Sequence, residues 1–471
     1  MARFPTVIQG GMGVGISDWR LARAVSELGQ LGVVSGTALD VILARRLQDG
    51  DKGGHTRRAL DAFPFPAMAQ RVWERYFIRG GRHPEEPYRS TPMHGMHSPV
   101  ELVELCIVGN FVEVWLAREG HTNAVGINYL EKIQLPHLPS LYGAMLAGVD
   151  YVLMGAGIPI RIPGALDALS RHEAAMYPIT VAGEGAEEDA RVTFDPREHM
   201  ECDLPPLKRP GFLAIVASAT LAATLAKKAN GRVDGFVVEG PAAGGHNAPP
   251  RGREPLSAAG EPVYGVRDEV DLAKIRELGL PFWLAGGFAT AEKLAEALHA
   301  GAAGVQIGTA FAFCEESGLR SDYKRGLLQQ VAAGTAMIFT DPCSSPTGFP
   351  FKTAMLAGTN SEARICEGRA RVCDIGLLRS AYRMEDGRIG FRCPAEPVAT
   401  YVAKGGTEEQ TRGRKCLCNC LLANAGLAQV RSGSAEQGLV TAGDDLTGLG
   451  RLLNGGASYH AADVLASVMP G

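Results

Sequence analysis

One histidine of the sequence stands where chemistry is expected. His246 ends the run EGPAAGGH (residues 239–246), which continues directly from the apolar residues 236–238. Small residues let a ligand approach the backbone closely, and α/β barrels place reactive side chains at the carboxyl ends of their strands. Because imidazole exchanges a proton near neutral pH, His246 is expected to act as acid, base or hydrogen-bond donor. The competing interpretation is a loop histidine that only bonds to backbone groups.

Two further apolar runs also end in glycine. Residues 281–287 (PFWLAGG) finish on Gly286 and Gly287, and residues 303–309 (AGVQIGT) finish on Gly308 and Thr309. They are one strand-plus-helix unit apart, so their ends should be neighbours. Backbone N–H groups at such ends can hold a phosphate, although plain turn formation would also use glycine. The GGMG loop at residues 10–13 is by itself only a weak indication of a nucleotide-binding site. The two other glycine-rich strand ends make that interpretation stronger.

The elements that must position these residues alternate between short apolar strands and helical patterns. Strands without period-2 patterning indicate a parallel sheet covered on both faces. We therefore predict an α/β fold, a (β/α)8 TIM barrel. A helix is expected over residues 18–28, capped by Ser17, and residues 177–181 with 191–194 are interpreted as an inserted hairpin. The eight predicted barrel strands are residues 6–9, 31–35, 124–130, 150–157, 212–217, 236–239, 282–285 and 304–307.

The barrel with its insertions is predicted to occupy residues 1–352. Lid-like insertions are expected at about residues 51–99 and 176–210, and residues 353–471 form a cysteine-rich C-terminal extension. Six of the ten cysteines lie in this extension, and clustered thiolates are typical of zinc or iron–sulfur sites. Reduced structural thiols are the alternative, since no C-x2-C pair is present. The predicted metal ligands are Cys373, Cys393, Cys416 and Cys418, the last two on one face of a strand.

Composition excludes several classes of protein. Lys+Arg number 47 against 51 Asp+Glu, a net charge of −4, so no electrostatic footprint for nucleic acid or an acidic membrane is visible. The longest apolar run, residues 211–226, is shorter than a membrane span, and the first twenty residues lack a secretory signal pattern. We expect a cytoplasmic enzyme with a small-molecule substrate and no nucleic-acid or membrane partner. A homodimer is compatible with these observations.

An ordered set of motifs over residues 1–352 resembles the nitronate monooxygenase (2-nitropropane dioxygenase) family, whose relatives include flavin-dependent enoyl-acyl-carrier-protein reductases. The motifs are IQGGMG (8–13), GIN (126–128), VAS (216–218), EGPAAGGH (239–246), LAGG (284–287) and VQIGT (305–309). The resemblance implies FMN in the barrel and catalysis by His246. The implied FMN contacts are Gly10, Gly11, Met12, Asn128, Ser218, Gly244, Gly245, Gly286, Gly287, Gly308 and Thr309.

Some of these residues have ordinary alternatives. Asn128 could only close a strand, Ser218 could only cap a helix, and Met12 could belong to the core. The resemblance implies oxidation of an alkyl nitronate by O2 to a carbonyl compound and nitrite. Two alternatives remain open: an enoyl-thioester reductase that uses NAD(P)H, and a flavin or metal redox sensor with the cysteine extension as its responsive part.

Overall fold

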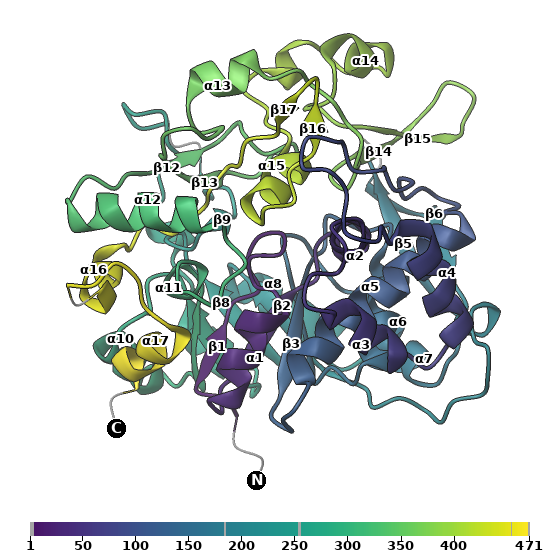
Figure 1. Cartoon of the computed structure of the whole chain (residues 1–471). Helices are drawn as coiled ribbons and strands as arrows, with labels where there is room; N and C mark the ends of the chain where they lie inside the picture. The colour runs from purple at the N-terminus through teal and green to yellow at the C-terminus, as the bar shows by residue number, and fades with distance from the viewer. Residues whose placement is uncertain (1–3, 183–184, 253–255, 454, 470–471) are drawn as a thin grey trace.

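In the computed structural model, residues 4–182, 185–252, 256–453 and 455–469 are described. Eight parallel strands form one sheet in the order β1-β11-β10-β8-β7-β4-β3-β2. The two outer strands meet through a parallel bridge between Ile8 and Leu31, where Gln9 N donates to Leu31 O and Leu31 N to Val7 O. The sheet is therefore closed, and the predicted (β/α)8 barrel is confirmed (Figure 1).

All eight predicted barrel strands are present, with ends shifted by at most two residues. Their bounds are β1 Val7–Gln9, β2 Gly32–Ser35, β3 Val125–Leu130, β4 Tyr151–Gly155, β7 Gly211–Val216, β8 Gly235–Glu239, β10 Phe282–Ala285 and β11 Gly304–Ile307. The helices that follow them along the chain are α1 Trp19–Glu27, α5 Val100–Arg118, α6 His137–Leu146, α7 Ile162–Ser170, α8 Ala219–Lys228, α9 Leu272–Arg276, α10 Ala291–His299 and α11 Thr309–Ala312.

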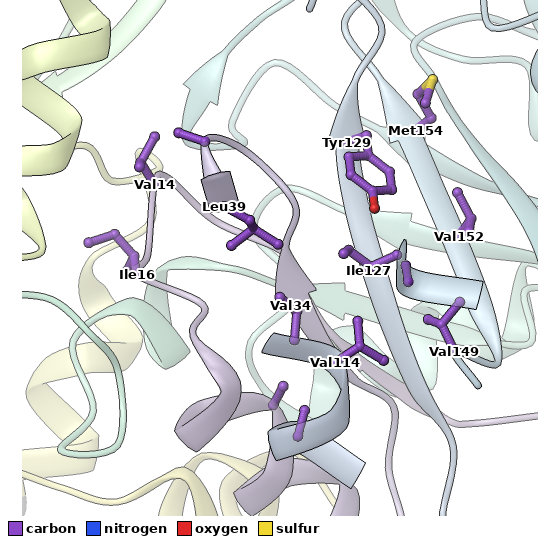
Figure 2. Close-up of a cluster of buried hydrophobic side chains, with 14 of the residues drawn as sticks. Val14, Ile16, Val34, Leu39, Val114, Ile127, Tyr129, Val149, Val152 and Met154 are labelled. Atoms are coloured by element: carbon purple, nitrogen blue, oxygen red, sulfur yellow. The ribbon is translucent and has the colours of Figure 1, made fainter. Parts of the chain in front are cut away.

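The strands are apolar on both faces because each face is buried against a different partner. Val33 and its inward-facing counterparts Leu153, Val237 and Trp283 fill the barrel interior. The intervening residues face the surrounding helices, as a parallel sheet requires. Figure 2 shows this outer layer, where Val34, Ile127 and Val152 lie with Val114 of α5.

The first predicted insertion is a helical layer. It contains α2 (Leu39–Gln48), α3 (His55–Asp61) and α4 (Pro66–Tyr76), followed by an irregular segment up to α5. The second insertion contains the predicted hairpin, β5 (Ala175–Val181) paired antiparallel with β6 (Gly185–Phe194). Residues 183 and 184 of this insertion lie outside the described residues.

The chain after the barrel packs back onto it. Strand β12 (Ile338–Asp341) pairs with β13 (Phe351–Ala354), which pairs with β9 (Gly245–His246). Strands β14 (Ser380–Arg383) and β15 (Ile389–Arg392) extend the sheet of the inserted hairpin. The remaining elements are α12 Ser321–Ala332, α13 Ala363–Gly368, α14 Val398–Ala403, α15 Leu417–Asn424, β16 Val430–Arg431, β17 Ser434–Ala435, α16 Thr447–Leu453 and α17 Ala461–Val468. In Figure 1 the extension lies above β9, where α15 is found, and its last helix, α17, contacts α10 and α11.

Two local predictions are wrong. Asp18, not Ser17, caps α1, because its side chain accepts the N–H groups of Arg20 and Leu21; the Ser17 hydroxyl instead bonds within the glycine-rich loop. Cys416 and Cys418 do not lie on a strand, since Cys416 is the N-cap residue of α15 and Cys418 lies in its first turn.

Among the described helices, none combines the length and hydropathy that a membrane crossing needs.

Candidate active site

A cavity of about 260 Å³ opens at the carboxyl ends of the barrel strands. The structure brings almost all of the predicted FMN contacts, and the predicted catalytic residue, to its wall. Ser218 is the exception, since it caps α8 by accepting the Leu221 N–H and does not line the cavity. The predicted residues that line it are Gly10, Gly11, Met12, Asn128, Gly244, Gly245, His246, Gly286, Gly287, Gly308 and Thr309.

The loop after β1 forms one wall of this cavity. Ser17 Oγ donates to Gly10 O and accepts the Met12 N–H, at 2.8 and 2.9 Å. Asn128 Nδ2 donates to Gly11 O at 3.0 Å. A Cβ at Gly11 would lie 2.4 Å from the Asn128 Cβ, so only glycine allows this close approach. Hydrogen bonds among its own residues thus hold this wall in place.

Asn128 and Gln306 each leave a polar atom without a partner. Asn128 Oδ1 and Gln306 Oε1 are buried acceptors with no hydrogen bond in the described structure, and both residues line the cavity. A buried acceptor without a partner is costly, by about 1–3 kcal/mol. These two oxygens therefore favour a ligand that carries N–H or O–H donors.

The glycine pair after β10 and the glycine before α11 form the end of the cavity predicted to hold phosphate. Gly286 and Gly287 have φ of +94° and +83°, a region that other residues enter only with strain. A Cβ at Gly287 would meet nothing within 4 Å, so this backbone is open toward the cavity. Gly308 and Thr309 follow β11, the neighbouring strand.

His246 lies on β9, where its register partner is Phe351 of β13. The two rings meet edge to face, with centroids 4.9 Å apart. His246 Nε2 and Ser345 Oγ share a hydrogen bond of 2.7 Å, and Ser345 Oγ is 2.8 Å from Thr347 Oγ1. Burial lowers the pKa of His246 to about 4. The ring is therefore neutral at physiological pH and available as a base or a hydrogen-bonding group.

Glu239 is a cavity residue that the sequence analysis did not select. It is the last residue of β8 and lines the cavity beside Ala285, its register partner. Burial raises the pKa of its carboxyl to about 7, so the group changes charge near neutral pH. A carboxylate that directly follows three apolar strand residues was the signal that could have identified it.

The segment 440–445, here called the strap, closes the cavity from the C-terminal extension. Its Thr441 Oγ1 accepts the Gly245 N–H at 2.9 Å, and its Gly443 N–H donates to Thr309 Oγ1 at 2.8 Å. The strap therefore joins β9, which carries His246, to the first residue of α11. No local sequence pattern pointed to it.

Part of the cavity wall is apolar, and the extension supplies much of it. Leu417 and Leu421 of α15 contribute alongside residues of the barrel loops. The apolar lining residues on this side are Leu130, Ile133, Phe351, Leu377, Leu378, Leu417 and Leu421.

The four predicted metal ligands also come together. Cys373, Cys393, Cys416 and Cys418 line a second, smaller cavity, and Cys418 lines the large cavity as well. No group of three or more His, Cys, Asp or Glu side chains is set to hold a metal ion within the described parts of the chain. The metal assignment therefore stays a prediction.

The fold and the cavity define a (β/α)8-barrel protein whose candidate active site lies at the carboxyl ends of the strands, the place used by enzymes of this fold. Residues 187–345 match the nitronate monooxygenase family model. The predicted resemblance is thus confirmed, and over this segment it supports an oxidoreductase.

Individual relatives agree with the family match over part of their length. The nitronate monooxygenase of Pseudomonas aeruginosa is 32% identical over 148 residues, which are 31% of this chain and 39% of the relative. A probable nitronate monooxygenase of Bacillus subtilis is 34% identical over 141 residues, 29% of this chain and 39% of the relative. The aligned part thus spans about two fifths of these curated relatives.

Solved structures with a similar chain path include two of low sequence identity. A nitroalkane oxidase from Streptomyces ansochromogenes has a TM-score of 0.48 at 16% identity, covering 99% of this chain and 95% of that one. FabK from Thermotoga maritima has a TM-score of 0.47 at 16% identity, covering 99% and 91%.

Proposed function

We propose that this protein is an FMN-dependent oxidoreductase of the nitronate monooxygenase type. The observation that carries the proposal is the meeting of His246 with the glycines of three separate strand ends around one cavity. The family match over residues 187–345 supports the same reaction class.

The cavity residues fit a flavin mononucleotide. The open backbone at Gly287 and the strand end at Gly308 suit its phosphate, and Met12 offers an apolar surface for its ring. Asn128 Oδ1 and Gln306 Oε1, both buried without partners, suit its N–H and ribityl O–H donors. When bound, FMN would accept electrons from the substrate and pass them to O2.

His246 would act on the substrate in two ways. A neutral imidazole can take the proton from the carbon next to a nitro group, or it can hold a nitronate that is already ionised. Ser345 fixes the ring through Nε2 at 2.7 Å, so the imidazole has one orientation relative to the cavity. The products of nitronate oxidation would be a carbonyl compound and nitrite.

The second candidate function, an enoyl-thioester reductase that uses NAD(P)H, is favoured by one specific observation. The cavity wall formed by α15 and the loops near Leu130 and Phe351 is apolar, and burial of an alkyl chain there is worth about 0.8 kcal/mol per methylene. A small nitronate has no need of such a wall, whereas an acyl chain would use it.

One anaerobic experiment separates the two functions. The purified protein, loaded with FMN, is mixed with an alkyl nitronate in one arm and with NADPH or NADH in the other. Bleaching of the flavin absorbance by the nitronate alone supports nitronate oxidation. Rapid bleaching by the nicotinamide, followed by reoxidation with an enoyl thioester, would replace it with the reductase.

Substitution of His246 tests its role under the proposed function. His246→Asn should lower turnover of a neutral nitroalkane by roughly a hundredfold or more, the usual effect of losing a general base. The preformed nitronate needs no deprotonation, so its turnover should fall far less. Equal losses with both substrates would show that His246 does not remove the proton.

A further inference from the structure

One carboxyl group faces the large cavity from the top of the barrel interior. Glu239 ends β8 and is paired with Ala285 of β10, which is paired with Gln306 of β11. Val237, two residues before Glu239, fills the barrel interior together with Ala285. Alternate residues of a strand share a face, so the side chains of Glu239 and Gln306 both point into the upper end of the barrel. Both residues line the cavity.

Asn128 of β3 lies in the same layer, because its register partner Leu153 also belongs to the barrel interior. We call Asn128, Glu239, Ala285 and Gln306 the floor of the cavity. The oxygens Asn128 Oδ1 and Gln306 Oε1 have no hydrogen bond in the described structure. An ionised Glu239 would add a third oxygen acceptor and a negative charge, whereas the neutral acid would supply an O–H donor. Protonation of Glu239 therefore changes both the charge and the hydrogen bonding of the floor.

Nothing in the described chain fixes the charge of this carboxyl. Burial is the one cause that acts on the Glu239 pKa and raises it to about 7, so neither a hydrogen bond nor a neighbouring charge contributes. Among the described residues, no Lys or Arg lines the cavity. Glu239 is partly accessible through the cavity, so its proton can exchange with solvent.

The other titratable side chains of the cavity wall are Tyr129, His246, Cys418 and Asp445. Burial raises the pKa of Tyr129 and of Cys418 well above their usual values and lowers that of His246 to about 4. These three groups therefore keep one charge state through neutral and mildly alkaline pH. Glu239 is the floor group that is placed to respond when a charge develops in the cavity.

Such a charge would develop when a flavin in the cavity is reduced. Two electrons add two negative charges, and a single proton on the flavin leaves one of them uncompensated. A like charge in a dry cavity raises the pKa of a carboxylate. Because no cationic side chain of the described chain lines the cavity, a proton on Glu239 is the available counter-charge.

We propose that Glu239 takes up a proton when FMN bound in this cavity is reduced, and releases it when the flavin is reoxidised. The substrate supplies two electrons, one proton joins the flavin, and a second proton forms the O–H bond of the Glu239 carboxyl. Both protons leave when O2 accepts the electrons. The inference rests on the proposed binding of FMN and not on which substrate is oxidised.

The test is the pH dependence of the flavin reduction potential, measured by spectroelectrochemical titration of the FMN-loaded full-length protein between pH 7.5 and 8.5. Each tenfold change in proton concentration shifts the potential of a two-electron couple by about 30 mV for every proton taken up. The wild type should therefore show a slope of about 60 mV per pH unit, and Glu239→Gln about 30 mV. Glu239→Asp keeps a carboxyl group and should restore most of the steeper slope.

The matched control is Glu131→Gln. Glu131 directly follows β3 at the same end of the barrel, does not line the cavity, and accepts a hydrogen bond from Tyr177 Oη at 3.0 Å. This variant should keep the wild-type slope. Equal slopes in the wild type and Glu239→Gln would overturn the inference. Loss of the steeper slope in His246→Asn instead would assign the proton to the imidazole.

FMN content and circular dichroism of each protein separate the possible failures. A wild-type chain that takes up no FMN would remove the proposed function and this inference together. A wild type with full FMN content and a slope of about 30 mV per pH unit would remove this inference alone. If Glu239→Gln does not fold, the slope of the wild type over the same interval decides.

Discussion

His246 Nε2 lies 2.7 Å from Ser345 Oγ, so a serine ninety-nine residues later in the chain fixes the orientation of the imidazole. Ser345 is fully buried and its hydroxyl also accepts the Thr347 N–H at 3.2 Å. The loop that carries both hydroxyls is itself held by Arg414, which donates to Cys343 O at 2.7 Å. The ring is thus positioned by the chain beyond the barrel, not by the strand end on which it is carried.

Ser345→Ala should weaken catalysis without emptying the cavity of FMN. The imidazole would lose its Nε2 partner and populate other orientations, so kcat/KM for the proton-abstracting substrate should fall by roughly ten- to a hundredfold. Ser345→Thr keeps the hydroxyl and should restore most of the loss. Steady-state kinetics with both substrate forms check this, and an Ala variant with wild-type kinetics would show that Ser345 does not position the ring.

The low pKa of His246 predicts how stability depends on pH. The pKa is lowered by burial from 6.5 to about 4 in the folded chain, so between these values the unfolded state binds the extra proton. The resulting stabilisation is present above pH 6.5 and is lost as the pH falls toward 4, at most about 3 kcal/mol. His246→Asn should therefore reduce the difference in unfolding free energy between pH 7 and pH 4.5, measured by urea titration. His137, whose pKa burial also lowers to about 4, should leave a residual slope in both proteins.

Much of this arrangement could be predicted from the sequence because it depends on local patterns. Barrel strands are buried on both faces, so each reads as a short apolar run, and each run that supports the cavity ends in glycine or a small polar residue. That is why all eight strands and the loops at Gly10, Gly286 and His246 could be assigned together. The inserted hairpin followed from the excess of strand-like segments.

The rest of the site depends on contacts that leave no local pattern. The strap, Ser345 and α15 reach the cavity from distant parts of the chain, and nothing in their own sequence indicates which surface they cover. The N-cap of α1 also depends on contacts that the local sequence does not show. Ser17 and Asp18 are both good cap residues, and the loop bonds of Ser17 to Gly10 and Met12 decided between them.

Gly287→Glu should prevent FMN binding, because the new side chain would extend into the cavity end predicted to hold the phosphate and repel it. Gly279→Glu is the matched control. Both glycines have positive φ, +83° and +69°, and a Cβ meets nothing within 4 Å at either, but only Gly287 lines the cavity. Each variant should lose about 1–2 kcal/mol of stability from the backbone strain. Flavin content after purification should be near zero for the first variant and unchanged for the second; equal content in both would exclude Gly287 from the phosphate site.

The raised pKa of the Glu239 carboxyl leads us to expect that flavin affinity changes near neutral pH. Burial raises the pKa of its carboxyl from 4.5 to about 7, so the group is neutral at pH 6 and anionic at pH 8. An anion in the same cavity as the flavin phosphate should weaken FMN binding by roughly tenfold above pH 7. In Glu239→Gln the FMN dissociation constant, measured by fluorescence quenching, should vary much less over this interval, because only the flavin phosphate, with a second pKa of about 6, still titrates there. A wild-type constant that is equal at pH 6 and pH 8 would contradict the assignment.

The strap offers the sharpest test of whether the C-terminal extension belongs to the candidate active site. Thr441 Oγ1 accepts the Gly245 N–H at 2.9 Å, and Gly245, with φ of +81°, directly precedes His246. Thr441→Val keeps the shape of the side chain but leaves that N–H without its partner, at a cost of about 1–3 kcal/mol. Thr441→Ser keeps the acceptor and is the matched control.

Because the unpaired group lies beside the histidine, the cost of Thr441→Val should be seen first in the site and not in global unfolding. We expect a fall in kcat of about tenfold or more, weaker FMN binding, and a nearly unchanged urea midpoint, all restored by Thr441→Ser. Wild-type kcat and FMN affinity in the valine variant would show that the strap only covers the cavity. A large loss of the urea midpoint with normal activity in the remaining folded protein would show that it only stabilises the fold.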